Sequence, residues 1–106
     1  MTNKKAIQIL TKAIDLLNKG FVKGSLATDK NGNDVSCKSR RAVNFCAEGA
    51  IRRLTRSNRE VLIDLVKSEN HLGQFQYLST INDSSDGKRK VIGLFKNTIK
   101  LLEKEA

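Results

Sequence analysis

One cysteine, the only histidine and an Asn-Asp pair follow one another in an order that some thiol hydrolases use. These residues are Cys46, His71, Asn82 and Asp83. A catalytic cysteine needs an exposed thiol with a lowered pKa and a base within hydrogen-bond reach. Cys46 instead stands on a stripe of apolar residues, and cysteine is among the residues most often buried. We therefore expect Cys46 to pack in the core, no catalytic residues, and a protein that is not an enzyme.

The same side chains offer too few ligands for a metal ion. A structural zinc site has four ligands, whereas Cys37, Cys46 and His71 supply three. The glycine-rich loop, residues 21–35 with Gly20 before it and Gly24 and Gly32 within it, contains neither G-x-x-x-x-G-K nor G-x-G-x-x-G, the two common phosphate-binding patterns. We expect no metal and no cofactor, and we expect the His71 side chain to cap the end of a helix.

Asp29, Asp83 and Asp86 could line a polar cleft beside the centre of the chain. The candidate residues are Phe21, Asp29, Asn82 and Asp83, and the cleft would take a cation or a small ligand. The alternative is that Asp83 caps the last helix while Asn82 satisfies buried backbone groups of the glycine-rich loop. We favour the alternative, because capping residues far outnumber ligands.

Basic residues are concentrated between residues 38 and 59, where seven of them stand against one acid, Glu48. The candidate binding residues are Arg40, Arg41, Arg52, Arg53, Arg56 and Arg59. Such a cluster suits nucleic-acid phosphates or an acidic protein, and its ordinary alternative is a solvated helix face. The sequence has no convincing helix-turn-helix signature and no aromatic platform for RNA bases.

The totals favour an acidic partner. The chain of 106 residues carries 20 Lys and Arg against 11 Asp and Glu, a net charge of +9, and its isoelectric point is about 9.9. A surplus of this size attracts nucleic acid, an anionic membrane surface or an acidic protein. No stretch approaches the roughly 20 apolar residues that cross a bilayer, so we expect a partner of acidic protein or nucleic acid and no membrane.

The cysteines and the N-terminus indicate a cytoplasmic protein. Two cysteines are too few for a disulfide scaffold, and one of them lies on an apolar stripe, so reduced thiols are expected. The N-terminus is polar and then amphipathic, without the apolar region of a secretory signal. A chain of this length forms one domain of common size, and we treat residues 1–106 as a single helical domain.

Apolar spacing predicts a mostly α fold of four to five helices. The expected helices start at Thr2 or Asn3 and end at Asn18, span Ser39–Arg56, run from Asn58 to Asn70 or Gly73, lie within Leu72–Ile81, and span Ser85–Lys104. The second of these is expected to be the hub, on a stripe made of Val43, Cys46, Ala47, Ala50 and Leu54. Gly49 in this helix costs about 1 kcal/mol relative to alanine, which indicates close backbone approach by a neighbour.

A minor β-hairpin near residues 25–36 is compatible with the same fold. The run Asp29-Lys30-Asn31-Gly32-Asn33 is a strong turn signal, and Asn-Gly favours a type I′ turn. Two very short strands would lie around Leu26 and Val35. An irregular loop that carries Phe21 into the core is an equal alternative.

Four motifs in order resemble a known family. They are Leu17-Asn18-Lys19-Gly20-Phe21-Val22-Lys23-Gly24, Ala27-Thr28-Asp29-Lys30-Asn31-Gly32, Ala42-Val43-Asn44-Phe45-Cys46-Ala47-Glu48-Gly49-Ala50 and Ile81-Asn82-Asp83. Between about residue 6 and residue 102, the chain resembles a family of short, mostly helical bacterial and phage proteins catalogued as a domain of unknown function. It departs from that pattern at Phe21 and Ile81, where tryptophan is frequent, and its helices are more basic. The resemblance implies a helical fold and a bacterial or phage setting, and it implies no activity.

The preferred hypothesis is a non-enzymatic interaction protein that acts through its basic surface. It would work in the cytoplasm of a bacterial host cell as a phage-encoded modulator or inhibitor of a host factor. The first alternative is a nucleic-acid-binding protein that uses the cluster from Arg40 to Arg59. The second is a small-ligand-binding domain with a cleft near Asp29 and Asp83.

Overall fold

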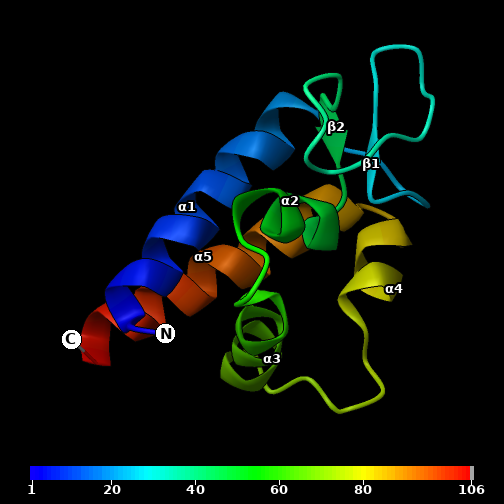
Figure 1. Cartoon of the computed structure of the whole chain (residues 1–106). Coiled ribbons are helices and arrows are strands. Elements are labelled where there is room, and N and C mark those ends of the chain that lie inside the picture. The colour runs from blue at the N-terminus through cyan, green and yellow to red at the C-terminus, as the bar shows by residue number, and fades with distance from the viewer. Residues whose placement is uncertain (106) are drawn as a thin grey trace.

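A computed structural model describes residues 1–105, and within them the chain forms five helices and two short strands (Figure 1). In chain order these are α1 (Asn3–Lys19), β1 (Ala27–Thr28), β2 (Asn44–Phe45), α2 (Ala47–Leu54), α3 (Arg59–Glu69), α4 (Leu78–Asp83) and α5 (Gly87–Glu105). The mostly α fold with a minor antiparallel β element is thereby confirmed.

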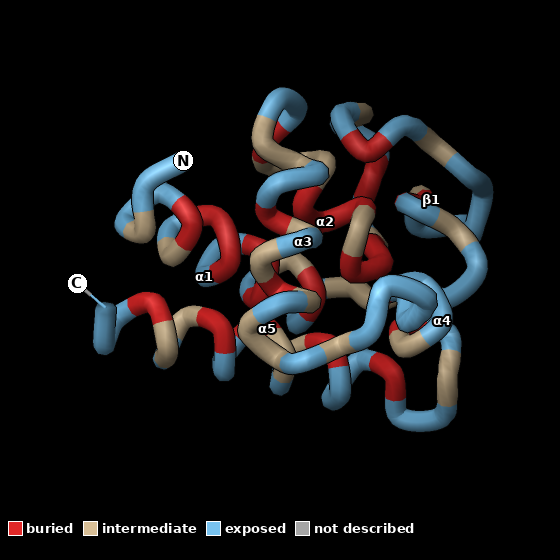
Figure 2. The backbone as a smooth tube through the Cα atoms, turned by 90° about the horizontal axis from the view of Figure 1, so that it is seen from below, coloured by how far each residue is buried: buried red, intermediate tan, exposed pale blue. Residues whose placement is uncertain are grey.

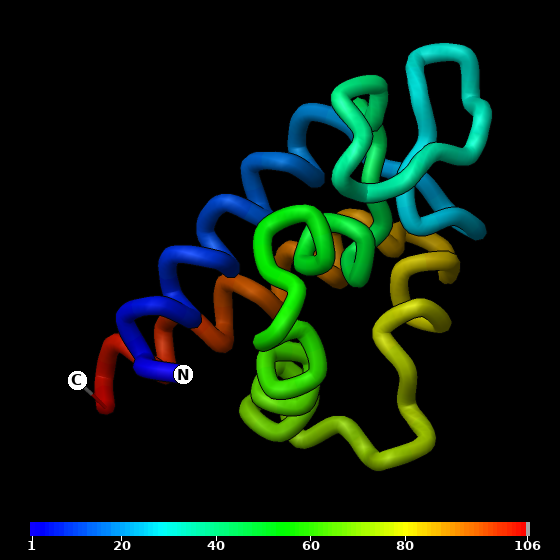
Figure 3. The backbone as a smooth tube through the Cα atoms, in the orientation of Figure 1, coloured from blue at the N-terminus to red at the C-terminus, as the bar shows by residue number. Residues whose placement is uncertain are grey.

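The two long helices, α1 and α5, lie side by side, with the start of α1 close to the end of α5 (Figures 1 and 3). The shorter α2 packs against α1, while α3 and α4 pack against α5. The buried segments of these helices face one another in the interior (Figure 2). One continuous apolar core results, with its largest fully buried side chains at Phe95, Leu10, Leu17, Ile51 and Leu62.

The β element is small and is made by distant parts of the chain. β1 pairs antiparallel with β2, with Ala27 opposite Phe45 and Thr28 opposite Asn44. The predicted turn is present: the N–H of Asp29 donates to the carbonyl of Asn33 at 2.9 Å. The N–H of Val35 donates to the carbonyl of Ala27 at 3.2 Å, so the segment after the turn also contacts β1. The ladder with residues 44–45 is a pairing that the sequence did not indicate.

The predicted hub helix is much shorter than expected. Residues 39–46 were predicted to be helical, and this is wrong, because their backbone groups bind the glycine-rich loop instead. The N–H of Phe45 donates to the carbonyl of Gly20 at 3.0 Å, and the N–H of Val43 donates to the carbonyl of Thr28 at 3.0 Å. Cys46 then caps α2, with its Sγ accepting the N–H of Gly49 at 3.3 Å. The hub therefore begins at Ala47.

Gly49 lies where the glycine-rich loop touches α2. A Cβ atom at this position would stand 1.8 Å from the carbonyl oxygen of Leu26, closer than any side chain tolerates. The predicted close backbone approach is confirmed. The backbone around Leu26 therefore lies directly against α2.

The segment before α4 also differs from expectation. A helix was predicted within Leu72–Ile81, whereas α4 starts at Leu78. Residues 72–77 instead form a connection with a turn, in which the N–H of Gln76 donates to the carbonyl of Gly73 at 3.0 Å. Phe75 and Tyr77 lie on this connection with 77% and 54% of their surface exposed.

Two glycine-to-alanine variants should change stability in opposite directions. Gly49→Ala should destabilise the protein by about 3 kcal/mol, because the added methyl group overlaps the backbone of Leu26. Gly93→Ala should stabilise it by about 0.5–1 kcal/mol, because Gly93 lies inside α5 with open space around it. Urea unfolding with a common slope measures both. A Gly49→Ala protein as stable as the wild type would contradict the close approach.

Candidate anion-binding site

The Asn82 side chain connects three parts of the chain. It is fully buried, and its Oδ1 accepts the N–H of Ala47, the first residue of α2, at 2.9 Å. Its Nδ2 donates to the carbonyl of Val22 at 3.1 Å and to Oδ1 of Asp83 at 3.0 Å. Asn82 therefore satisfies backbone groups of the glycine-rich loop and of α2, which is the role that we favoured for it from the sequence.

Asp83 does not cap the last helix, and that part of the prediction is wrong. α5 begins three residues beyond Ser84, at Gly87, and the Oδ1 of Asp83 accepts the N–H of Gly24 at 3.0 Å. The hydrogen bond from Asn82 and the one from Gly24 hold the pKa of the Asp83 carboxyl below its usual range. Asp83 thus fastens the outer end of the glycine-rich loop to α4.

The predicted polar cleft is divided. Asn82 and Asp83 line a pocket of about 220 Å³ together with Cys46. Asp29 lines a different pocket, of about 340 Å³, and its pKa is lowered mainly by the hydrogen bond from the Asn33 N–H. Phe21 packs against the core as a partly buried side chain. The four residues of the candidate cleft therefore do not meet in one of these pockets, because the turn that carries Asp29 points away from α4.

The Arg53 side chain holds a loop against α2 through hydrogen bonds to the loop backbone. Its Nη1 donates to the carbonyl of Cys37 at 3.0 Å and to the carbonyl of Ser39 at 2.7 Å. In return, Nζ of Lys38 donates to the carbonyl of Arg53 at 2.8 Å. These bonds hold residues 37–39 against the C-terminal end of α2. Arg53 therefore stabilises the wall of the site, whereas the sequence analysis predicted it to bind a partner.

A basic pocket lies where this clamped loop faces α2 and the start of α3. It has a volume of about 340 Å³. Its walls are formed by Leu26, Val35, Ser36, Cys37, Lys38, Arg52, Thr55, Arg56 and Arg59. Three of the six predicted arginines therefore meet here, while Arg40 and Arg41 lie beside Asp29 in the other pocket.

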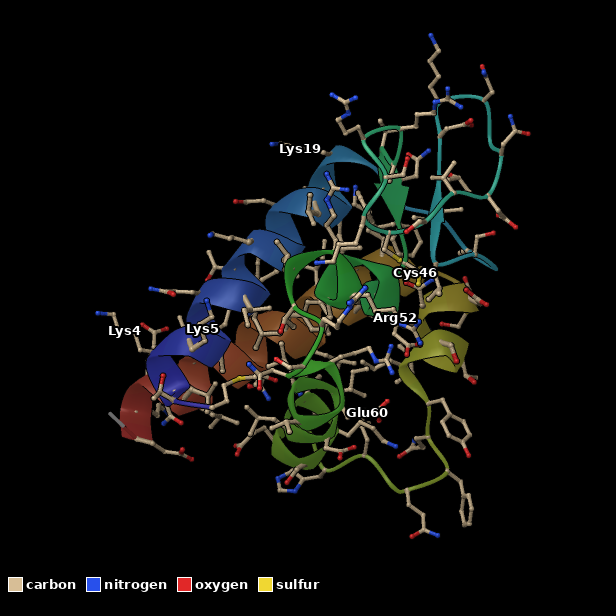
Figure 4. All side chains as sticks on the ribbon, viewed as in Figure 1. Lys4, Lys5, Lys19, Cys46, Arg52 and Glu60 are labelled. Atoms are coloured by element: carbon tan, nitrogen blue, oxygen red, sulfur yellow. The ribbon has the colours of Figure 1, made fainter. Side chains whose placement is uncertain are left out.

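Other cations are spread over the molecule. Lys4, Lys5 and Lys19 are distributed along α1, away from the segment of α2 and α3 that carries Arg52 and Glu60 (Figure 4). The pocket residues are distinguished by being gathered in a hollow. Charges in a hollow share a less polar environment than single charges on a convex surface, so they attract a counter-ion more strongly.

Two guanidinium groups in the pocket have donors left over. Nη2 of Arg52 pairs with Glu48 at 3.2 Å, and Nη2 of Arg59 pairs with Glu60 at 3.2 Å. The Nε atoms of Arg52 and Arg59 are both buried, and neither has a hydrogen-bond partner within residues 1–105. Buried polar groups are usually paired, and an unpaired one costs about 1–3 kcal/mol. Because Arg52 and Arg59 line the pocket together with Lys38 and Arg56, four cationic side chains border one hollow, and we regard the pocket as a candidate anion site.

Both cysteines are free and buried. Burial raises the pKa of the Cys37 thiol and that of the Cys46 thiol, so both are protonated near neutral pH. The predicted burial of Cys46 is confirmed, although it caps α2 instead of lying inside it. His71 ends α3 through its backbone, in the left-handed region with φ of 56°, instead of through its side chain. Among residues 1–105, no group of three His, Cys, Asp or Glu side chains could hold a metal ion.

Sequence reasoning missed several residues of the pocket wall. Lys38 belongs to the basic run but was not among the predicted binding residues. No sequence motif marks Ser36 or Thr55 as part of a binding site. Their proximity to the arginines depends on the clamp by Arg53 and on the approach of Leu26 to α2, which join residues more than ten positions apart.

Fold and site together define a small, mostly helical domain with a cationic pocket at the junction of α2 and α3. The chain belongs to the family of unknown function DUF6197, whose family model matches residues 1–101. This confirms the resemblance to an uncharacterised family. Comparison with curated proteins and with solved structures gives no match. Within residues 1–105, no helix is both long and apolar enough to cross a lipid bilayer.

Replacing Asn82 should be among the most destabilising single changes to a polar residue of this protein. Asn82→Ala leaves the N–H of Ala47 and the carbonyl of Val22 without their partners. We expect a loss of about 3 kcal/mol in the free energy of unfolding. The matched control is Asn18→Ala, an exposed asparagine on α1, which should cost less than about 0.5 kcal/mol. Equal unfolding midpoints for the two variants would contradict the bridging role.

The bonds of Asp83 should make the protein acid-sensitive. Because the folded-state pKa of Asp83 is lowered, its contribution to stability is present above the ordinary aspartate pKa and is lost as the pH falls through the lowered value. The stability difference between the wild type and Asp83→Asn should be larger at about pH 6 than at about pH 2.5. Urea midpoints at both pH values measure it. A difference that does not change with pH would contradict the hydrogen bonds from Asn82 and Gly24 to this carboxylate.

Proposed function

We propose that this protein is a non-enzymatic interaction protein that binds an acidic protein partner through the pocket of Lys38, Arg52, Arg56 and Arg59. The observation that carries the proposal is a single hollow lined by these four cationic side chains. An acidic side chain of a partner would accept hydrogen bonds from them, and charge-assisted hydrogen bonds are stronger than those between neutral groups.

A protein partner is supported further by the surface next to the pocket. Glu48 and Glu60, which pair with the pocket arginines, also line a second pocket that contains Tyr77. Tyr77 and Phe75 are both exposed, and aromatic side chains are enriched in protein–protein interfaces. The exposed aromatic residues therefore lie next to the basic pocket. In a protein–protein interface, the central binding residues are likewise surrounded by further contacts.

Nucleic acid is the second candidate, and the geometry favours it less. A protein that binds nucleic acid through its charge commonly makes about 6–10 phosphate contacts. Arg53 is used inside the fold, and Arg52 and Arg59 are each paired with a glutamate. That leaves Arg40, Arg41 and Arg56 as the exposed members of the predicted cluster. Three residues make a small footprint for a phosphate backbone.

The setting that we propose is the cytoplasm of a bacterial cell, with a host factor as partner and a phage as one source of the protein. The free state of Cys37 and Cys46 supports a reducing compartment. The net charge of +9 supports a protein that works by binding an acidic partner.

The test uses a glutamate-rich peptide and a short DNA duplex as probes. Arg56→Gln should weaken peptide binding about fivefold, equivalent to roughly 1 kcal/mol, because Arg56 is exposed at the pocket and its removal leaves the fold intact. The control Lys100→Gln removes the same charge from the exposed surface of α5 and should change binding less than about twofold. Calorimetry at about 50 mM and about 200 mM salt measures both.

Equal losses in Arg56→Gln and Lys100→Gln would show that net charge alone is responsible, and this would overturn the proposal. Tighter binding of the DNA than of the peptide, with the larger loss again in Arg56→Gln, would replace the protein partner by nucleic acid.

A further inference from the structure

The donors in the basic pocket come from several directions. Arg52 belongs to α2 and Arg59 to the first turn of α3. Ser36 and Lys38 belong to the loop on the opposite wall. An anion in this hollow would meet donors from the loop, from α2 and from α3, instead of a single guanidinium fork.

Two hydroxyl groups complete this donor set. The Oγ of Ser36 already accepts the N–H of Lys38 at 3.2 Å, and the Oγ1 of Thr55 accepts the N–H of Asn58 at 3.4 Å. Because each oxygen is used as an acceptor, its own O–H remains to donate. Neutral donors beside cationic ones suit a ligand with more oxygen atoms than a carboxylate has.

The charge of the pocket matches a dianion. Four cationic side chains line it, and two of them, Arg52 and Arg59, are paired with Glu48 and Glu60. Two positive charges are therefore left without a partner acid. A carboxylate carries one negative charge and accepts in one plane, whereas a phosphate monoester carries about −1.5 to −2 charges on three oxygens that point in different directions.

From the directions of the donors and the residual charge, we infer that the pocket binds the phosphoryl group of a phosphate monoester. This inference rests on the proposed function, since it names the anion that the same pocket takes from a partner. The phosphoryl group can belong to a phosphorylated side chain of a partner protein or to a free phosphorylated metabolite. The recognition chemistry is the same for both.

The Nε–H signals of Arg52 and Arg59 in a ¹⁵N-labelled protein report on binding directly. Inorganic phosphate should shift both signals at a concentration about tenfold lower than acetate requires at equal ionic strength. The overturning result is an absence of shifts with phosphate, or equal shifts with the two anions. If the acidic peptide still binds through Arg56 in that case, the phosphoryl inference fails while the proposed function stands. If no anion binds at the pocket, both fail.

Removing one neutral donor separates the two kinds of anion. Thr55→Val keeps the shape of a nearly buried side chain and deletes its hydroxyl, so phosphate affinity should fall about tenfold, while the affinity for the acidic peptide should fall by less than about threefold. Thr80→Val, an exposed position on α4, is the matched control and should leave both affinities unchanged. Equal effects of Thr55→Val on the two affinities would contradict the inference.

Two further probes identify the source of the phosphoryl group. A phosphoserine peptide that binds more tightly than glycerol phosphate supports a phosphorylated partner protein, and the reverse order supports a free metabolite. Either order upholds phosphoryl recognition, whereas failure of both compounds to compete with inorganic phosphate overturns it.

Discussion

The buried amide of Asn82 is the interaction on which the rest of this structure depends. A helix starts with N–H groups that have no acceptor inside the helix, and in α2 the first of them is satisfied by Oδ1 of Asn82. The Nδ2 of the same side chain holds the carbonyl of Val22 in the glycine-rich loop. One side chain on α4 thus fixes both the start of α2 and the path of the loop that covers it.

The basic pocket follows from this arrangement. Once the loop lies on α2, Gly49 lets the backbone of Leu26 come into contact with the helix, and Arg53 clamps residues 37–39 against its other end. Residues 35–38 then stand opposite Arg52 and the first turn of α3, and a hollow lined by cations remains between the two sides. The pocket is a product of the fold, while the lysines along α1 and α5 contribute to net charge and are screened from it by salt over about 8 Å.

The long helices could be predicted from the sequence to within a few residues, because their apolar periodicity is strong and local. The central helix could not. Val43 fits the stripe by spacing, yet it is 45% exposed, since hydrogen bonds to residues of the distant loop hold residues 43–45 extended. Local spacing carries no information on such partners. On α5 the buried side chains include Thr98 beside Val91 and Phe95. The Thr98 hydroxyl can be buried because Nδ2 of Asn70, at the C-terminal end of α3, donates to it.

The candidate site, too, could be predicted from the sequence only in part. The sequence indicated the arginine-rich segment and the bridging role of Asn82, since both depend on residue type. It did not indicate that Arg53 points into the fold, that the cleft near Asp29 and Asp83 is split, or that two Nε–H groups lack acceptors. Each of these depends on contacts between residues that are far apart in the chain, such as Arg53 with Cys37 and Asp83 with Gly24.

Native-state hydrogen exchange of the Ala47 amide tests the central claim most directly. An N–H in the first turn of a helix ordinarily exchanges quickly, as expected for Arg59 in α3, where the N-cap side chain makes no capping bond. Because Asn82 accepts the Ala47 N–H inside the core, Ala47 should exchange only through opening close to global unfolding. If Ala47 exchanges as fast as Arg59, the Asn82 bridge does not hold the start of α2, and neither the path of the glycine-rich loop nor the basic pocket depends on it.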